Sequence, residues 1–441
     1  MYICEIFTTI IFNPCLKMIL SLNVENFRSI KGPLDLNLTA ENRLKEHKLV
    51  NNSISQNGFE LLKSLLLYGR NASGKSNVLL ALKALSYLVE NSDSFKHDKK
   101  IDSYEPFLFN PSSNNQPVKI EIDFITIENR TRFKYLVSFN NSEIIFEALY
   151  IFPLRTQAKL FERNKGKITY GEYYKGAKKK IESDLLPNQL FLSKSSTSNV
   201  KYLDECYLYF SKYVYVSTIH DTEYDKSIIR SFSELLLNDN KLKYNLLELL
   251  RAADTAISDF SIIENEKEMK FPESFPEIIK KDILDSYKYE VKTKHSIYEN
   301  GKKIGNTTID LENESFGTKK LFAIGGLVLD ALSDGSVIVI DELDKGLHPI
   351  LTKLIINLFN SKKNNPNNAQ LIFATHDSSL LDLDMLRRDQ ICFVDKTYEE
   401  ESILYKLSDI KGIRKDSPID KWYLSGRFEG IPITSEPQLE F

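Results

Sequence analysis

Short apolar runs that end in polar residues recur along the chain, and they predict interior strands of a parallel sheet. Val337–Ile340 is followed by two carboxylates, residues 65–67 lead into a glycine-bounded loop, and residues 371–374 end at a threonine and a histidine. Wholly apolar runs of this length are typical of strands that are buried on both faces. Because parallel sheets bind ligands at the carboxyl ends of their strands, we expect the residues after these runs to share one crevice.

Other stretches alternate between apolar and polar positions, which predicts antiparallel strands. The alternation runs through residues 118–139 and 142–152 and indicates a β-lobe beside the crevice. Residues 287–311 alternate around Asn300 and Gly301, a dipeptide that is typical of hairpin turns. We expect this hairpin to lead the chain back to the parallel sheet.

Apolar residues at helical spacing predict several helices. One follows the glycine-bounded loop, with Val78, Leu82 and Leu85 on one face. In the middle of the chain, helices are expected over residues 233–250 and 252–258. No heptad pattern persists there, so the sequence does not predict a long coiled coil.

The loop after residue 67 is a complete phosphate-binding pattern, G-x-x-x-x-G-K-S. Its residues are Gly69, Arg70, Asn71, Ala72, Ser73, Gly74, Lys75 and Ser76, and Asn77 follows. Glycines let backbone amides turn toward phosphates, and the helix N-terminus adds partial positive charge. In such loops the lysine reaches the β- and γ-phosphates and the serine hydroxyl binds Mg²⁺. The alternative is a glycine turn before an exposed lysine, but the strand before it and the helix after it argue against this reading.

The two carboxylates after Val337–Ile340 fit the same chemistry. Asp341 would hold the Mg²⁺, directly or through water. Glu342 would lie beyond the metal, where a carboxylate can orient and deprotonate the attacking water. His376 could donate a hydrogen bond to a γ-phosphate oxygen. The alternatives are a solvated loop acid for Glu342 and a capping or core residue for His376.

A helix start precedes the acid-bearing strand. Ser315 is a good N-cap, residues 319–332 are apolar at helical spacing, and Gly335 is a plausible stop. Ser315 and Gly317 therefore form a second potential anion seat, although most helices begin in this way.

Composition narrows the functional class. The chain has 441 residues, enough for two or three domains, and a net charge of −3, so no strong field attracts nucleic acid or anionic lipid. Its four cysteines form no C-x-x-C pair, which indicates a reducing cytoplasm without a disulfide framework or zinc site. No apolar run reaches the roughly 20 residues that span a bilayer, so no membrane partner is expected. No nuclease or H-E-x-x-H constellation is visible.

The order and spacing of these motifs resemble the ABC-type ATPases of the SMC, RecF and OLD class. Within that class the chain is most similar to the bacterial AAA-family ATPases linked to abortive infection and phage defence. The stretch NVENFRSI, residues 23–30, resembles their opening motif, and S-F-G at 315–317 stands where their signature stands. Leu343-Asp344 matches the D-loop, GLHP follows at 346–349, and the tail at 423–433 is also similar.

This resemblance implies an α/β fold: a P-loop ABC-type ATPase head with a mixed sheet, an antiparallel β-lobe and an α-rich insert. Residues 1–17 are expected to be a leader or a mis-annotated start. Residues 18–154 would form the N-terminal half of the ATPase domain with the β-lobe, residues 155–286 the insert, and residues 287–441 the C-terminal half.

The resemblance also implies a homodimer that encloses two ATP molecules. Each ATP would be held by Lys75 and Ser76 of one chain and by Ser315 and Gly317 of the other. Arg28 would lie near the nucleotide, and Asp344 would act across the dimer. Two departures put the hydrolysis rate in doubt: the signature is reduced to S-x-G, and no convincing Q-loop glutamine is present, Gln116 being a weak candidate.

The expected function is that of a slow, partner-regulated ATPase, with ATP as substrate and Mg²⁺ as cofactor. It would act in the cytoplasm as the sensor subunit of an anti-phage defence system whose effector is a separate protein. A higher oligomer and bound DNA are further candidates. The alternatives are a RecF-like DNA repair ATPase that clamps DNA, and a nucleotide switch that does not hydrolyse ATP.

Overall fold

The three apolar runs lie side by side in a six-stranded sheet, as the sequence predicts. In this computed structural model the order is β11-β15-β16-β5-β17-β18, and all neighbours are parallel except the β17–β18 pair at one edge. The strands are β11 (Val214–Ser217), β15 (Val337–Ile340), β16 (Gln370–Ala374), β5 (Ser64–Tyr68), β17 (Ile391–Lys396) and β18 (Ser402–Lys406). Every residue of β5, β15 and β16 is buried, because helices cover both faces.

The structure describes residues 16–428 with short gaps at 45–46, 57, 127–130, 177, 219–221, 254, 266–270, 273–274, 278–279, 281–283 and 285–287. The predicted leader therefore lies outside the described residues except for its last two. Leu16 is buried, and the Lys17 ammonium lies 3.6 Å from the centroid of the Tyr213 ring. The packed part of the chain thus begins before the expected boundary at Met18. Residues 429–433 of the predicted tail motif also lie outside the described residues.

A second sheet has seven antiparallel strands and forms the predicted β-lobe. Its order is β10-β9-β8-β7-β6-β1-β2. The strands are β1 (Met18–Glu25), β2 (Leu34–Asn37), β6 (Val118–Ile125), β7 (Arg132–Phe139), β8 (Ile144–Ile151), β9 (Ala158–Asn164) and β10 (Lys167–Tyr170). A small pair, β3 (Ser53–Gln56) and β4 (Phe59–Leu62), lies beside them.

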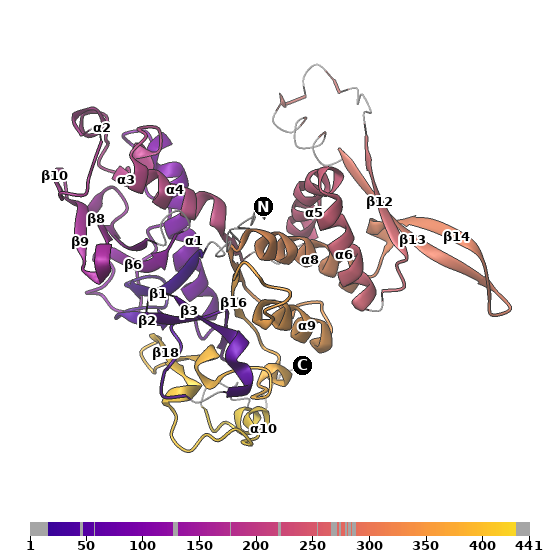
Figure 1. Ribbon diagram of the computed structural model, residues 1–441. Helices are drawn as coiled ribbons and strands as arrows, with labels where there is room; N and C mark the ends of the chain where they lie inside the picture. Colours follow the sequence, from indigo (N-terminus) through magenta and orange to yellow (C-terminus); the bar gives the residue numbers. More distant parts are fainter. Residues whose placement is uncertain are drawn as a thin grey trace, which may run out of the picture.

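Helix α1 (Lys75–Asn91) lies between the two sheets (Figure 1). Val78 and Leu82 on its buried face meet Ile19 of β1 and Val339 of β15 in one continuous core. On the opposite face of the parallel sheet, α8 (Phe316–Asp334) and α9 (Pro349–Asn360) share a second core with Leu66. The alternate residues of β5 thus pack into two different cores, which explains why residues 65–67 at its centre are all apolar.

Residues 155–286 are not a single α-rich insert. Strands β9 and β10 extend the β-lobe, and β11 joins the edge of the parallel sheet beside β15. Where this segment is described, its helices are α2 (Lys179–Ser183), α3 (Phe191–Ser195), α4 (Lys201–Tyr213), α5 (Thr222–Asn238) and α6 (Asn240–Ala252). Helices α5 and α6 pack against α8 rather than forming a separate unit (Figure 1).

Two helix predictions in this segment are wrong. The expected helix over 233–250 is interrupted, because the Asp239 side chain accepts hydrogen bonds from the amides of Lys241 and Leu242 and caps a new helix. The expected helix over 252–258 is absent from its described residues, since α6 ends at Ala252 and Ala256 has φ of 57°. Apolar spacing alone did not reveal either stop.

The predicted hairpin is confirmed. It consists of β13 (Tyr289–Glu299) and β14 (Lys302–Asp310), and β12 (Asp259–Glu264) pairs with β13 on the other side. Asn300 and Gly301 both have positive φ, 48° and 76°, as a tight hairpin turn requires. The hairpin projects away from the two large sheets (Figure 1).

The remaining helical segments are short. They are α10 (Ile419–Leu424) and 3₁₀ turns at His47–Asn52, Ser92–Ser94, Pro153–Arg155, Leu311–Asn313, Ser378–Leu380, Arg388–Gln390 and Leu407–Asp409. Within the described part of the chain, no helix combines the length and the apolar character needed to cross a bilayer.

Candidate active site

The phosphate-binding loop connects β5 to α1 and passes under the β17–β18 pair. Its two glycines are needed there. A Cβ on Gly69 would lie 2.1 Å from the carbonyl oxygen of Val394, and one on Gly74 would lie 2.1 Å from Oγ of Ser402. Gly74 also has φ of 108°, which side-chain-bearing residues rarely adopt. The loop is therefore fixed both by its own backbone and by the strands above it.

A chain of hydrogen bonds holds this loop to distant parts of the sequence. The Ser402 hydroxyl lies 2.6 Å from the carbonyl oxygen of Ser73 and 2.7 Å from the Ser29 hydroxyl. The Ser29 hydroxyl in turn accepts a hydrogen bond of 2.7 Å from the side-chain NH2 group of Asn77. Since a hydroxyl donates only one hydrogen, Ser402 donates to Ser73 and accepts from Ser29. Sequence analysis missed Ser402, because nothing in its local pattern marks it.

Lys75 is buried at the centre of the loop. Its ammonium donates to the carbonyl oxygens of Gly69 and Arg70 at 2.8 and 3.1 Å. Burial lowers the pKa of Lys75 to about 8, against the opposing effect of nearby carboxylates such as Asp341 and Glu342. Lys75 is thus placed between the loop backbone and the acids at the end of β15.

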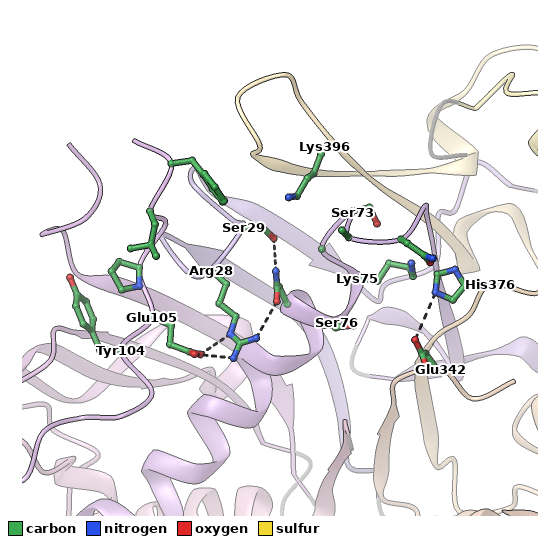
Figure 2. A pocket seen from close by; sticks show the side chains of 17 residues that line it. Arg28, Ser29, Ser73, Lys75, Ser76, Tyr104, Glu105, Glu342, His376 and Lys396 are labelled. Atoms are coloured by element: carbon green, nitrogen blue, oxygen red, sulfur yellow. Dashed lines mark hydrogen bonds and ion pairs between the residues drawn. The ribbon is translucent and has the colours of Figure 1, made fainter. Parts of the chain in front are cut away.

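The acids follow the end of β15 in the predicted order. Asp341 is buried, and its amide donates to the carbonyl oxygen of Ser217 at 2.9 Å. Glu342 has φ of 49°, an unusual value for a residue other than glycine. This turn directs the Glu342 carboxylate to within 3.5 Å of the Lys345 ammonium. The same carboxylate lies 4.0 Å from Nε2 of His376 (Figure 2).

His376 and Asp344 complete this end of the site. Burial, with Lys75 nearby, lowers the pKa of His376, so its imidazole is neutral near pH 7. The His376 amide donates to Oδ2 of Asp344 at 3.4 Å. Oδ1 of Asp344 is buried and has no hydrogen-bond partner among the described residues. The D-loop and the switch-histidine loop are therefore in contact.

These residues face two adjoining cavities. The first, of about 1020 Å³, is lined by Arg28, by residues 71–77, and by Glu342 and His376. In Figure 2, Lys75, Glu342 and His376 lie toward one end, and Tyr104 and Glu105 toward the other. The second, of about 690 Å³, is lined by Gly69, Arg70, Asn71, Glu342, Asp344 and His376, among others. Most of the predicted nucleotide residues are thus brought together.

Arg28 lies in the wall of the first cavity. Its guanidinium forms a two-pronged ion pair with the Glu105 carboxylate, at 2.7 and 2.9 Å, and lies 3.5 Å from Oδ1 of Asn77 (Figure 2). Glu105 was not predicted, because residues 104–109 match no motif considered in the sequence.

The signature residues do not line either cavity of their own chain. Ser315 is the N-cap of α8, and its hydroxyl accepts a hydrogen bond from the Thr318 amide at 3.1 Å. Gly317 lies close to the Gly346 carbonyl, where a Cβ would be at 3.2 Å. Gln116, the weak Q-loop candidate, is also absent from the cavity walls, and its carbonyl accepts a hydrogen bond from Asn26.

The residues present fit Mg²⁺. Ser76 supplies a hydroxyl in the cavity wall, and Asp341 supplies a carboxylate at the end of β15, which is separated from β5 by β16. Mg²⁺ prefers oxygen ligands and is usually held by one or two protein groups together with water and substrate phosphates. Among the described residues no cluster of three or more metal-binding side chains occurs. This donor set therefore suits a metal that arrives with a phosphate ligand.

This chain is similar to several solved structures at low sequence identity, among them SMC heads and a RecF protein. The SMC head bound to the C-winged helix domain of ScpA is 13% identical, with a TM-score of 0.43 and coverage of 88% of this chain and 97% of that chain. The SMC head from Thermotoga maritima is 12% identical, with a TM-score of 0.39 and coverage of 88% and 98%. RecF with ATP is 13% identical, with a TM-score of 0.32 and coverage of 89% and 99%. With TM-scores below 0.5, these similarities carry no weight in the assignment.

A family model provides the decisive comparison. The model described as "AAA domain, putative AbiEii toxin, Type IV TA system" matches residues 64–382, more than half of the chain. A search of curated proteins finds no match. The matched residues contain the phosphate-binding loop, the acids after β15 and His376. This chain therefore belongs to the AAA-domain family that is described as a putative AbiEii toxin of a type IV toxin–antitoxin system.

Proposed function

We propose that this chain binds Mg²⁺–ATP in the first cavity and hydrolyses it there. The observation that carries the proposal is the shared end of that cavity, where Lys75 of the phosphate-binding loop lies beside Glu342 and His376. A triphosphate on the loop would place its γ-phosphate at this end. Within one chain, the arrangement supplies a lysine for the phosphates, a carboxylate for the attacking water and a histidine for the γ-phosphate.

Each side chain has a distinct role in this mechanism. Lys75 exchanges its bonds with the loop carbonyls for the β- and γ-phosphate oxygens. Glu342 accepts a proton from the attacking water, and neutral His376 donates to a γ-phosphate oxygen. Ser76 and Asp341 would hold Mg²⁺, which neutralises charge on the β- and γ-phosphates when bound.

We propose further that two copies enclose two ATP molecules. Ser315 and Gly317 line neither cavity of their own chain, yet Ser315 begins an α-helix of 19 residues at the surface. The N-terminus of such a helix attracts phosphate. The signature of a second copy can therefore complete the site, with Asp344 at the contact between copies.

The biological role that we propose is a nucleotide-gated sensor in an anti-phage defence system. The family description, which names an AbiEii toxin and a type IV toxin–antitoxin system, supports a role of this kind. We place the toxic activity in a separate effector protein. The alternatives make different predictions: a RecF-like clamp would be stimulated by DNA, and a switch would bind ATP with negligible turnover.

Phosphate release by the purified chain tests the proposal. The wild type is assayed with Mg²⁺–ATP, with and without double-stranded DNA, beside Lys75→Ala and the control Lys362→Ala. Lys362 lies beyond α9, outside both cavities. We expect turnover that Lys75→Ala abolishes and Lys362→Ala retains. Binding without turnover, even after addition of DNA, would favour the switch.

A further inference from the structure

Residues 104–109 form the wall of the first cavity that faces away from the acids. The polar residues of this cavity gather around the phosphate-binding loop, whereas Leu108 and Phe109 contribute large apolar side chains. These two side chains are 66% and 63% exposed. Exposed apolar surface in the wall of a binding cavity points to a ligand with an apolar face.

The direction of the bound nucleotide follows from the cavity itself, given the proposed ATP site. Glu342 and His376 mark the γ-phosphate end, so the α-phosphate, the ribose and the base extend the other way along the loop. Figure 2 shows Tyr104 and Glu105 on that opposite side. The base of the bound nucleotide therefore lies toward the wall that carries Leu108 and Phe109.

This wall is anchored rather than loose. Phe107 is fully buried, its amide donates to Oδ1 of Asn26 at 3.1 Å, and its ring packs edge-on against Phe109 at 5.6 Å between centroids. The carbonyl oxygen of Glu105 accepts a bond of 2.7 Å from the Arg28 amide. Phe109 is thus held in place while most of its surface stays open.

One cation accompanies the aromatic ring. The Lys396 ammonium lies 5.7 Å from the centroid of the Phe109 ring, and Lys396 also lines the cavity. Its backbone carbonyl lies 3.5 Å from the Arg70 guanidinium, so this residue connects the wall to the phosphate-binding loop. An aromatic ring beside a cation is a favourable surface for a nucleobase.

We propose that Phe109, flanked by Leu108 and Lys396, is the nucleobase platform of this ATPase and that it recognises the flat face of a purine rather than its edge. Tyr104 carries the one side-chain hydroxyl of segment 104–109, and this hydroxyl already bonds to the carbonyl oxygens of Asn114 and Gln116. It is therefore engaged elsewhere and does not bond to the edge of the base. Glu105 is likewise engaged by Arg28. ATP and GTP therefore bind with similar affinity, and UTP binds more weakly because its ring is smaller. The inference rests on the proposed ATP site.

The test compares a nucleotide with a ligand that has no base. Calorimetry measures the Kd of a non-hydrolysable ATP analogue and of inorganic tripolyphosphate, both with Mg²⁺. Phe109→Ala should raise the Kd of the analogue about 5- to 150-fold, the range that corresponds to base–aromatic stacking, and leave tripolyphosphate unchanged. Phe109→Trp should restore the affinity.

The control is Tyr298→Ala. Tyr298 is 65% exposed and lies next to exposed Ile297 on the β13–β14 hairpin, outside the cavity. An unchanged analogue Kd in Phe109→Ala, or an equal loss of tripolyphosphate, would overturn the platform. So would a preference for ATP over GTP above about 100-fold, because only contacts to the base edge discriminate so strongly.

The two proposals fail in different ways. If the wild type binds neither the analogue nor tripolyphosphate, the ATP site itself is wrong and the platform falls with it. If Lys75→Ala loses both ligands while Phe109→Ala keeps both, the ATP site stands and the platform is wrong, and the exposed pair then serves another contact. Thermal melting checks that Phe109→Ala folds, which its exposure favours.

Discussion

The carboxylate of Glu342 lies 4.0 Å from Nε2 of His376, across the phosphate end of the first cavity. The Lys345 ammonium is 3.5 Å from the same carboxylate. Because burial and Lys75 lower the pKa of His376, its ring is neutral and leaves the negative charge of Glu342 uncompensated on that side. The Glu342 carboxylate is thus placed between the Lys345 ammonium and the His376 ring, close to where a γ-phosphate would lie.

Glu342→Gln should stop hydrolysis while retaining the nucleotide. The amide keeps the shape of the side chain but cannot accept the proton of the water, and loss of a general base typically costs about 10²–10⁴-fold in rate. Light scattering with Mg²⁺–ATP should show a stable dimer or larger assembly. Glu312→Gln, outside both cavities, is the control. Hydrolysis by Glu342→Gln at the wild-type rate would show that Glu342 is not the base.

Asp341→Asn should fail at an earlier step. It removes a negative oxygen ligand, so Mg²⁺–ATP should bind poorly and the mass in solution should not respond to nucleotide. Calorimetry with and without Mg²⁺ measures the effect, which should be confined to the metal-containing titration. An unchanged, Mg²⁺-dependent affinity would exclude Asp341 as a metal ligand.

Nucleotide affinity should fall as the pH rises through about 8. The pKa of Lys75 is lowered to about 8 in the free protein, so its ammonium loses its proton above that pH. Bound phosphates favour the charged form, and binding near pH 8.5 should therefore take up a proton. Calorimetry in two buffers of different ionisation enthalpy measures this uptake. The uptake attributed to Lys75 should vanish in Lys75→Met, and its persistence there would assign it to another group.

The Lys75 pKa also predicts how stability depends on pH. An unfolded chain holds this proton up to the ordinary lysine range, whereas the folded chain releases it near pH 8. The unfolded state therefore binds more protons in between, and the contribution of Lys75 to stability increases with pH over this window. Urea unfolding of the wild type and Lys75→Met between pH 7.5 and 10 should show this difference in slope, and parallel curves would contradict it.

Ser402→Ala should weaken nucleotide binding, although Ser402 lies outside the phosphate-binding pattern of residues 69–76. Without its hydroxyl, the carbonyl of Ser73 loses its donor and the phosphate-binding loop loses a brace. A lost hydrogen bond of this kind costs about 0.5–1.5 kcal/mol of stability. We expect a lower melting temperature and a higher Kd for ATP. Ser333→Ala, on the exposed side of α8, is the control, and equal behaviour of the two variants would show that the brace is unimportant.

The local pattern of apolar and polar residues predicted the parallel strands at the centre of this molecule correctly. The strands β5, β15 and β16 each contain a continuous apolar run because both faces of the sheet are covered, and such runs can be recognised from the local sequence. The capping of α8 by Ser315 and its stop at Gly335, with φ of 69°, also follow from local chemistry. The motif residues fell into one crevice because parallel strands present their carboxyl ends at one edge.

What the sequence did not reveal depends on residues far apart in the chain. The bond between Ser402 and Ser73 joins positions 329 residues apart, and Glu105 pairs with Arg28 across 77. Neither position carries a periodic or motif signal. Strand β11 was not predicted either. It lies at the edge of the sheet beside β15, so most of its residues are only partly buried and it lacks a long apolar run. Tertiary packing decides which distant segments pair, and the periodic spacing of apolar residues along the sequence does not predict those pairs.

The position of β5 between β16 and β17 has a consequence for synthesis. The strand that carries the phosphate-binding loop is made early, but its two neighbours come from residues 370–374 and 391–396, near the other end of the chain. On the ribosome, β5 and the loop that follows it therefore lack these neighbours until more than 300 further residues, up to residue 396, have emerged. Contacts of such long sequence separation form slowly, and exposed strands invite aggregation meanwhile. The phosphate-binding loop can thus reach its folded arrangement only after residues 391–406 have been made, when β17 and β18 close over it.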